Sequence, residues 1–193
     1  PQPLADGTHT FAVRAVNTAG VAGDPISFAL WVDTTPPSIT AYAPTPGALL
    51  NTAAPATTAT VGDSHSGVDQ TTIQLLLNGA QMPVTFDPAS QTLVMYSAGA
   101  YREGPNNLEL RVRDAVGNAA APLLWSVTVD TVPPVGTLAI HGGAAITTSL
   151  YVTLGFSATD DTSGVVAMRL SNEMFGGYVQ EPYATLRELW ALH

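Results

Sequence analysis

The chain has 193 residues, of which 46% are hydrophobic and 11% charged, and its 15 acidic and six basic residues give a net charge of −9 at pH 7. This balance argues against binding to nucleic acid, because too few cations are present to displace the counterions of phosphates. The absence of cysteine excludes disulfides and thiolate metal sites. No apolar run is long enough to predict insertion into a membrane.

Apolar and polar residues alternate with a period of two along most of the chain, which predicts β-strands. In the first half, strands are expected at 10–16, 25–33 and 72–77. The third of these is followed by an Asn78-Gly79 pair suited to a hairpin turn. Trp31 has the opposite parity from its apolar neighbours, so its side chain should point outward.

The second half continues the same pattern, with strands expected at 107–113, around Trp125 and at 150–157. The tail at 183–193 admits either a helix or a strand. Short strands separated by turns every eight to twelve residues are typical of an all-β protein with a Greek-key sandwich. The inward-facing residues that should be buried are Phe28, Leu30, Leu108, Leu110, Trp125 and Val127.

The sequence also repeats itself with a fixed period of 97 residues. The hexapeptide VDTTPP at 32–37 recurs as VDTVPP at 129–134, and the Asp, Ser-Gly and Val of 63–68 recur within 160–165. A long fixed period indicates structural units in tandem. The tail at 183–193 aligns with a segment of strand character, so the strand is the favoured interpretation.

The repeat predicts three segments made of Ig-like β-sandwich modules. Residues 1–35 are expected to form the last strands of one module, 36–132 a complete module, and 133–193 the first strands of a further, incomplete module. A unit of 97 residues is long enough to bury its own core.

Three motifs carry a resemblance to a known family. In chain order, the segments DSHSGV at 63–68, RDAVGN at 113–118 and VDTVPP at 129–134 resemble the bacterial Ig-like (Big-type) tandem repeats of large extracellular and surface adhesin-like proteins. Asn17 and Val21 depart from this pattern. The resemblance implies an extracellular or cell-surface location, a bacterial origin and a structural or adhesive role.

Aspartates gather at the expected ends of the modules, and the favoured interpretation is that they cap turns. The resemblance implies an alternative, because some bacterial Ig-like arrays bind Ca²⁺ at their junctions. Such a site would use Asp63 or Asp160 together with Asp33 or Asp130, and it would need six to eight oxygen ligands. No other cofactor is expected.

Catalytic motifs are not apparent. The four histidines have no spacing typical of a zinc site, no Gly-x-Ser-x-Gly segment occurs, and no pair of carboxylates suggests glycoside hydrolysis. The sequence therefore predicts a protein that is not an enzyme.

The two end segments are complementary parts of one module. Residues 1–35 correspond to the last two strands, which the segment 133–193 lacks. The sequence predicts that one chain binds another head to tail, unless the chain is only a window cut from a longer array. The residues expected at this interface are Phe11, Val13, Phe28 and Leu30 on one side and Val152, Leu154, Phe156, Met168 and Leu170 on the other.

Two classes of function follow from these observations. The first is a structural or adhesive extracellular repeat protein that acts as a spacer or fibre subunit. The second is a carbohydrate-binding or protein-binding accessory module of a larger secreted enzyme. An aromatic platform on an exposed sheet would favour the second class, and a continuous interface between modules would favour the first.

Overall fold

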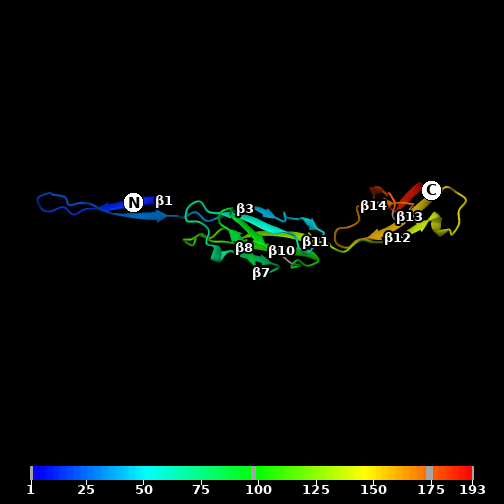
Figure 1. The fold of residues 1–193 in the computed structure, drawn as a ribbon, viewed down its shortest axis with the longest axis horizontal. Coiled ribbons are helices and arrows are strands. Elements are labelled where there is room, and N and C mark those ends of the chain that lie inside the picture. The colour runs from blue at the N-terminus through cyan, green and yellow to red at the C-terminus, as the bar shows by residue number, and fades with distance from the viewer. Residues whose placement is uncertain (1, 97–98, 173–175, 193) are drawn as a thin grey trace. The chain divides into compact units, whose positions relative to one another are not determined.

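The computed structural model describes residues 2–96, 99–172 and 176–192 (Figure 1). Within these ranges the regular structure is nearly all β, and the helical segments are two 3₁₀ turns, η1 (Gln70–Thr72) and η2 (His141–Gly143). The predicted all-β, Ig-like sandwich fold is confirmed. One compact unit ends at Val129 and a second begins at Asp130. No helix among the described residues is long and apolar enough to cross a bilayer.

An antiparallel hairpin opens the chain. It consists of β1 (Gly7–Val13) and β2 (Ile26–Val32), paired from Gly7 opposite Val32 to Val13 opposite Ile26. These two strands form a sheet of their own. The predicted burial of Phe28 and Leu30 is wrong, since their exposed fractions are 68% and 42%. The physical reason is that no second sheet among the described residues covers the apolar face of this hairpin.

The segment from Ser38 to Val129 folds as a sandwich of two sheets. One sheet has the order β3-β5-β9-β8, with strands Ser38–Ala43, Thr57–Gly62, Thr92–Met95 and Val84–Asp87. The other has the order β4-β11-β10-β6-β7, with strands Leu49–Leu50, Leu123–Val129, Gly104–Arg111, Gln74–Leu77 and Ala80–Met82. Side chains from both sheets meet in one apolar core.

An Ig-like module is expected to have seven strands, and the described part of this sandwich has nine. Part of the difference lies at Pro83, which separates β7 from β8. Proline has no N–H to donate to a ladder, so the extended chain is interrupted there and its two halves join different sheets. The Asn78-Gly79 turn between β6 and β7 is confirmed, and both residues adopt the positive φ that such a tight turn requires, at 52° and 82°.

The core of the sandwich follows the predicted alternation. Leu108 and Leu110 on β10, and Trp125 and Val127 on β11, are all buried, which confirms the prediction for these four residues. Trp125 also packs against Tyr42 with a centroid separation of 5.2 Å. Alternate residues of β10 and β11 point to the solvent side, as the period of two requires.

The second unit contains a three-stranded sheet and a separate two-stranded ribbon. The sheet has the order β12-β13-β16, with strands Val135–Ile140, Tyr151–Thr159 and Leu186–Ala191. The ribbon pairs β14 (Ala167–Leu170) with β15 (Val179–Pro182). The strand interpretation of the tail is confirmed by β16. The small core is formed by Val152, Leu154 and Leu170, with Phe156, Met168 and Trp190 packed against it.

Candidate functional site

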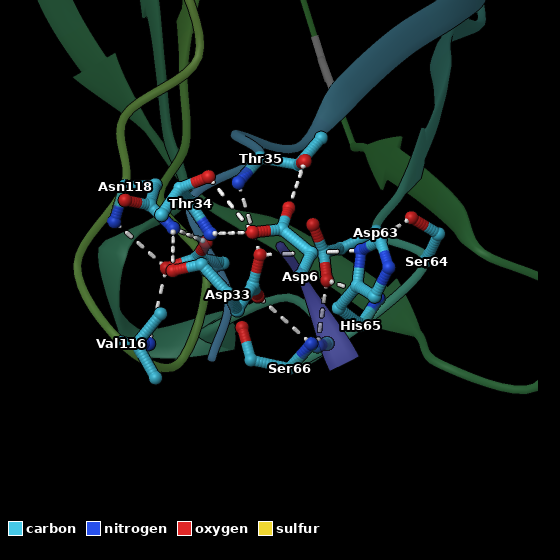
Figure 2. A network of polar contacts seen from close by, with 12 residues as sticks. Asp6, Asp33, Thr34, Thr35, Asp63, Ser64, His65, Ser66, Val116 and Asn118 are labelled. Atoms are coloured by element: carbon cyan, nitrogen blue, oxygen red, sulfur yellow. Dashed lines mark hydrogen bonds and ion pairs between the residues drawn. The ribbon is translucent and has the colours of Figure 1, made fainter. Parts of the chain in front are cut away.

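Acidic side chains converge where the chain passes from the hairpin into the sandwich (Figure 2). Four segments supply them: the residue before β1, the linker that follows β2, the turn that follows β5 and the turn between β10 and β11. In the last three segments the acid stands at the start of a turn, where Asp is favoured because its carboxylate accepts hydrogen bonds from backbone N–H groups two to four residues ahead. The site is therefore built from local turn chemistry brought together by the fold.

Asp63 and Asp114 each accept hydrogen bonds from backbone N–H groups of the turn that they begin. The Oδ1 atom of Asp63 accepts hydrogen bonds from His65 N at 3.0 Å and Gly67 N at 2.8 Å. The Oδ1 atom of Asp114 accepts from Val116 N at 3.0 Å and from Asn118 N at 2.7 Å. The predicted role of these aspartates as turn caps is confirmed.

In the second unit, Asp160 repeats the arrangement of Asp63. Its Oδ1 atom accepts hydrogen bonds from Thr162 N at 3.1 Å, Ser163 N at 2.8 Å and Gly164 N at 2.9 Å. The N–H groups of Ser163 and Gly164 are the main cause that lowers the pKa of this carboxyl below its usual value, and neighbouring Asp130 contributes as well. Asp130 caps its own linker by accepting from Val132 N at 3.2 Å.

Asp33 ties the linker to both turns of the sandwich. Its Oδ1 atom accepts from Thr35 N at 3.0 Å, its Oδ2 atom accepts from Ser66 N at 2.9 Å, and its carbonyl oxygen accepts from Asn118 Nδ2 at 3.2 Å. Only 3% of the Asp33 side chain is exposed. The Ser66 hydroxyl is the largest cause that lowers the pKa of Asp33, although desolvation opposes it, and the backbone N–H groups and His65 act in the same direction as Ser66.

Asp6 joins the same network from the residue before β1. Its Oδ1 atom accepts from Thr34 N at 2.9 Å and Thr34 Oγ1 at 2.8 Å, and its Oδ2 atom accepts from Thr35 Oγ1. The two threonine hydroxyls, Thr35 first, lower the pKa of Asp6. Asp6 is not among the residues that the sequence predicts for this site. One signal that could have identified it is the acidic residue Glu103 at the corresponding position one period later.

The arrangement of these acids fits a hard cation. One ligand atom from each of Asp33, Asp63 and Asp114 lies within 4.8 Å of the others, and the same holds for Asp6, Asp33 and His65. The Oδ2 atom of Asp63 is buried and accepts no hydrogen bond from the residues that the structure describes. An unpaired carboxylate oxygen among other carboxylates is costly to bury, and Ca²⁺ prefers carboxylate and carbonyl oxygens. Asp33, Asp63 and Asp114 are therefore the residues that would hold such an ion.

The four aspartates predicted as metal ligands lie in two pairs, one in each unit. Asp33 and Asp63 are joined by Asp114 and Asp6, and Asp130 lies beside Asp160 in the second unit. His65 Nδ1 lies 4.0 Å from Asp33 Oδ1, which allows an ion pair when the imidazole is protonated.

The residues predicted for an interface between chains fall into two groups. On the hairpin, Phe11 lies opposite Phe28, and these two side chains together with Val13 and Leu30 are exposed. In the second unit, Val152, Leu154 and Leu170 are buried, whereas Phe156 and Met168 are partly buried against them.

No family model matches the chain, and no curated protein matches it. A solved structure of the fibronectin(III)-like modules of Clostridium thermocellum CbhA is similar with 19% sequence identity and a TM-score of 0.37, over 65% of this chain and 64% of that one. The chain thus spans 64% of the length of the structure that it matches.

Proposed function

We propose that this chain is a structural protein of the extracellular space or cell surface, in which Ig-like sandwich units act as spacers or as the subunits of a fibre. It would belong to the bacterial Ig-like repeats that its three motifs resemble, and it would have no enzymatic activity. The observation that supports this proposal is the linker at Asp33, which hydrogen-bonds the two turns of the sandwich that it enters.

A spacer needs linkers that do not bend freely. The linker after β2 contains Pro36 and Pro37, whose rings fix φ and restrict the residues before them. Its preceding residues are held by the side chains of Asp6, Asp33 and Asn118. A flexible Gly/Ser-rich linker would behave as a random coil, whereas the prolines and hydrogen bonds of this segment restrict its backbone.

The repeated use of the same turns also supports a role for repeated units. Asn17 Oδ1 accepts hydrogen bonds from Ala19 N and Val21 N, just as Asp114 Oδ1 does from Val116 N and Asn118 N. The isolated bridge between Val16 and Ala22 corresponds in the same way to that between Arg113 and Ala119. All of these pairs are separated by 97 residues.

Distance measurements between spin labels test the linker. The chain has no cysteine, so Thr18→Cys in the hairpin loop and Gln81→Cys on β7 would be the only labelled positions. We expect a narrow distance distribution in the parent protein and a broad one after Asp33→Ala. Asp87→Ala, which removes the cap of the β8–β9 turn, is the control and should leave the distribution narrow. A parent distribution as broad as that of Asp33→Ala would overturn the spacer proposal.

A binding role as an accessory module is the second candidate, because Trp31 is 62% exposed on β2. An exposed indole ring can stack on a sugar or on an apolar side chain of a partner. Titration calorimetry with soluble plant and bacterial polysaccharides tests this candidate. Binding that disappears in Trp31→Ala would favour it over a purely structural role.

A further inference from the structure

A hollow of about 540 Å³ opens on the sandwich at one end of the sheet that contains β6, β10 and β11. Its volume lies within the range of small-molecule sites in proteins, about 300–1,000 Å³. All of its lining residues lie between positions 71 and 122, so neither linker and neither end of the chain forms part of it. None of the acids of the candidate metal site lines it.

A change of register between β10 and β11 gives the hollow its shape. Leu110 lies opposite Leu123, and a bridge further along pairs Arg113 with Ala119. The two residues 111–112 therefore face the three residues 120–122, so the returning segment holds one extra residue, as in a β-bulge. Pro122 lies in that segment and has no N–H to donate to the ladder.

Two arginines line this hollow from alternate positions of one segment. Arg111 and Arg113 are both exposed, whereas Val112 between them is buried. The backbone of Arg113 is held firmly, since its N–H donates to Thr72 Oγ1 at 3.0 Å and its carbonyl oxygen accepts from Asp69 N at 3.0 Å. A side chain carried by a fixed backbone is well placed to hold a ligand in one position.

Most N–H groups of the two guanidinium groups have no protein acceptor. Each guanidinium carries five N–H donors. Arg111 Nε donates to Glu109 Oε1 at 2.6 Å, and Arg113 Nη1 donates to Gly117 O at 3.0 Å. Within the described ranges, the remaining donors of both arginines and the side-chain amide of neighbouring Gln74 form no hydrogen bond with the protein.

The hollow is a cationic place on an acidic protein. Two of the six basic residues of the chain line it, and its lining residues include no acid, although the net charge of the chain is −9. Glu109 pairs with Arg111, so these two residues and Arg113 together carry a net charge of +1. An anionic ligand is therefore favoured here more than elsewhere on this surface.

The repeat shows that the turn does not need the second arginine. The hairpin of β1 and β2 makes the same change of register, because Val13 lies opposite Ile26 and the next bridge pairs Val16 with Ala22. Val16 stands 97 residues before Arg113 and takes its place in that turn. The turn thus forms with valine at this position, and the guanidinium of Arg113 is available for a ligand.

The surroundings of the arginines favour an acidic sugar over an acidic peptide. A carboxylate matches the planar fork of a guanidinium, and the Thr71 hydroxyl and Gln74 amide suit the hydroxyls of a sugar ring. The apolar lining is small and offers no pocket for a large side chain: Ala119, Ala120 and Pro122. An extended peptide would need a free strand edge, but β10 has β6 on one side and β11 on the other.

We propose that this hollow binds a carboxylated sugar unit of an acidic polysaccharide. Arg111 and Arg113 hold the carboxylate, and Gln74 hydrogen-bonds a neighbouring hydroxyl of the same sugar. The inference goes beyond the spacer function, because it gives the sandwich a ligand, and it does not involve Trp31. Since a few exposed hydrogen bonds carry the binding, we expect a dissociation constant on the order of 1 mM for a short oligosaccharide.

Nuclear magnetic resonance of the arginine Nε–H groups locates the ligand on the 193-residue chain. The probes are trisaccharides of galacturonate, of mannuronate and of hyaluronate type, and six arginines give few signals to assign. With at least one probe, the signals of Arg111 and Arg113 should shift and saturate, whereas that of Arg102, which does not line the hollow, should stay in place. If no probe shifts both signals, or if all six arginines shift equally, the proposal is wrong.

Arg113→Val tests the contribution of the second arginine with the residue that the repeat itself places there. It should weaken binding about tenfold or more, because a charge-assisted hydrogen bond is lost, and Arg111→Gln should act in the same way. The matched control is Arg102→Gln, which removes one charge outside the hollow and should leave the dissociation constant nearly unchanged. Calorimetric titration gives the affinities, and amide hydrogen exchange over β10 and β11 checks the fold. Equal weakening by Arg113→Val and Arg102→Gln would indicate attraction to overall charge alone and overturn the site.

Changes to the probe identify the chemistry that is recognised. The methyl ester of the best-binding trisaccharide keeps the ring and its hydroxyls but loses the charge, so it should bind at least about tenfold more weakly. An oligomer of glutamate that binds as tightly as the sugar would indicate an acidic peptide, and inorganic phosphate that does so would indicate an unselective anion site. Either result overturns the proposal. The spacer function is measured separately, by the spin-label distances across the linker, so each proposal can fail without the other.

Discussion

At the scale of single residues, the same position in the repeat has opposite energetic roles in its two copies. Leu110 is completely buried in the sandwich, whereas Val13, its counterpart, is 69% exposed. We expect Leu110→Ala to destabilise the sandwich by about 2–5 kcal/mol, through lost burial and the cavity left behind. Val13→Ala should change the stability of the monomer by less than about 0.5 kcal/mol. Urea unfolding at low protein concentration checks both values, and equal losses would contradict the assignment of the two surfaces.

The carboxylates of the linker should make stability depend on pH. Asp6 and Asp33 both have a pKa below the usual value of 3.8, because hydroxyl and N–H donors favour their charged form. A carboxyl group whose pKa is lower in the folded state than in the unfolded state stabilises the fold at pH values above its unfolded-state pKa. This stabilisation is lost as the pH falls through the folded-state pKa.

We therefore expect urea midpoints that are constant near neutrality and fall when the pH drops below about 4. Asp33→Asn should be less stable than the parent at neutral pH, and it should lose less stability on acidification. If the urea midpoints of the parent and of Asp33→Asn fall equally on acidification, Asp33 does not contribute to the pH dependence.

Calcium binding is the prediction that concerns Asp63. Its Oδ2 atom is buried next to Asp33 and Asp114, and no donor in the described part of the chain hydrogen-bonds it. We expect millimolar Ca²⁺ to raise the melting temperature of the metal-free protein, because an ion that binds only the folded state stabilises it by mass action. Asp63→Asn should abolish the rise and Asp87→Asn should not. Calorimetric titration without any heat of binding would leave turn capping as the only role of these acids.

At the scale of elements, the strands were largely predictable, because the alternation of apolar and polar residues shows directly which face of a sheet each side chain lies on. The strand predicted at 72–77 nevertheless begins only at Gln74. The residues before it form η1, whose first turn is capped by Asp69 Oδ1 accepting from Thr71 N. Such a cap competes locally with the extended conformation, and a hydrophobic pattern does not detect it.

The candidate site was predictable only in part. The sequence indicated acids at turns, since Asp before Ser-Gly or Gly-Asn has a local capping role. It did not indicate that Asp33, Asp63 and Asp114 converge, because convergence depends on which turns the sandwich brings to the same place. It also did not include Asp6, which precedes a strand rather than beginning a repeated turn motif. The prediction that Phe28 and Leu30 are buried was wrong for a related reason. The alternation of residues gives the face of the strand on which a side chain lies, but not what covers that face.

The hairpin turn between β6 and β7 gives a prediction for a single element. Gly79 has a φ of 82°, and a Cβ added there would meet no atom within 4 Å. Gly79→Ala should therefore cost only the backbone strain of the left-handed region, about 1–2 kcal/mol. The control is Gly177→Ala, where the backbone φ is not positive and the added methyl group also meets nothing. Denaturant unfolding measures the loss of stability in each variant. Equal losses would contradict the conclusion that the turn requires a left-handed backbone at Gly79.

At the scale of the whole molecule, the short parallel pairing of β4 with β11 affects how strongly the sandwich resists a stretching force. Thr128 and Val129 lie beside Leu49 and Leu50, and two further backbone hydrogen bonds, Gly47 N to Ser126 O and Thr128 N to Ala48 O, extend the contact. Tension applied through the two linkers pulls β4 toward the N-terminus and β11 toward the C-terminus. Because the strands are parallel, this tension loads their hydrogen bonds together in shear instead of opening them one after another. The sandwich should thus resist stretching along the chain.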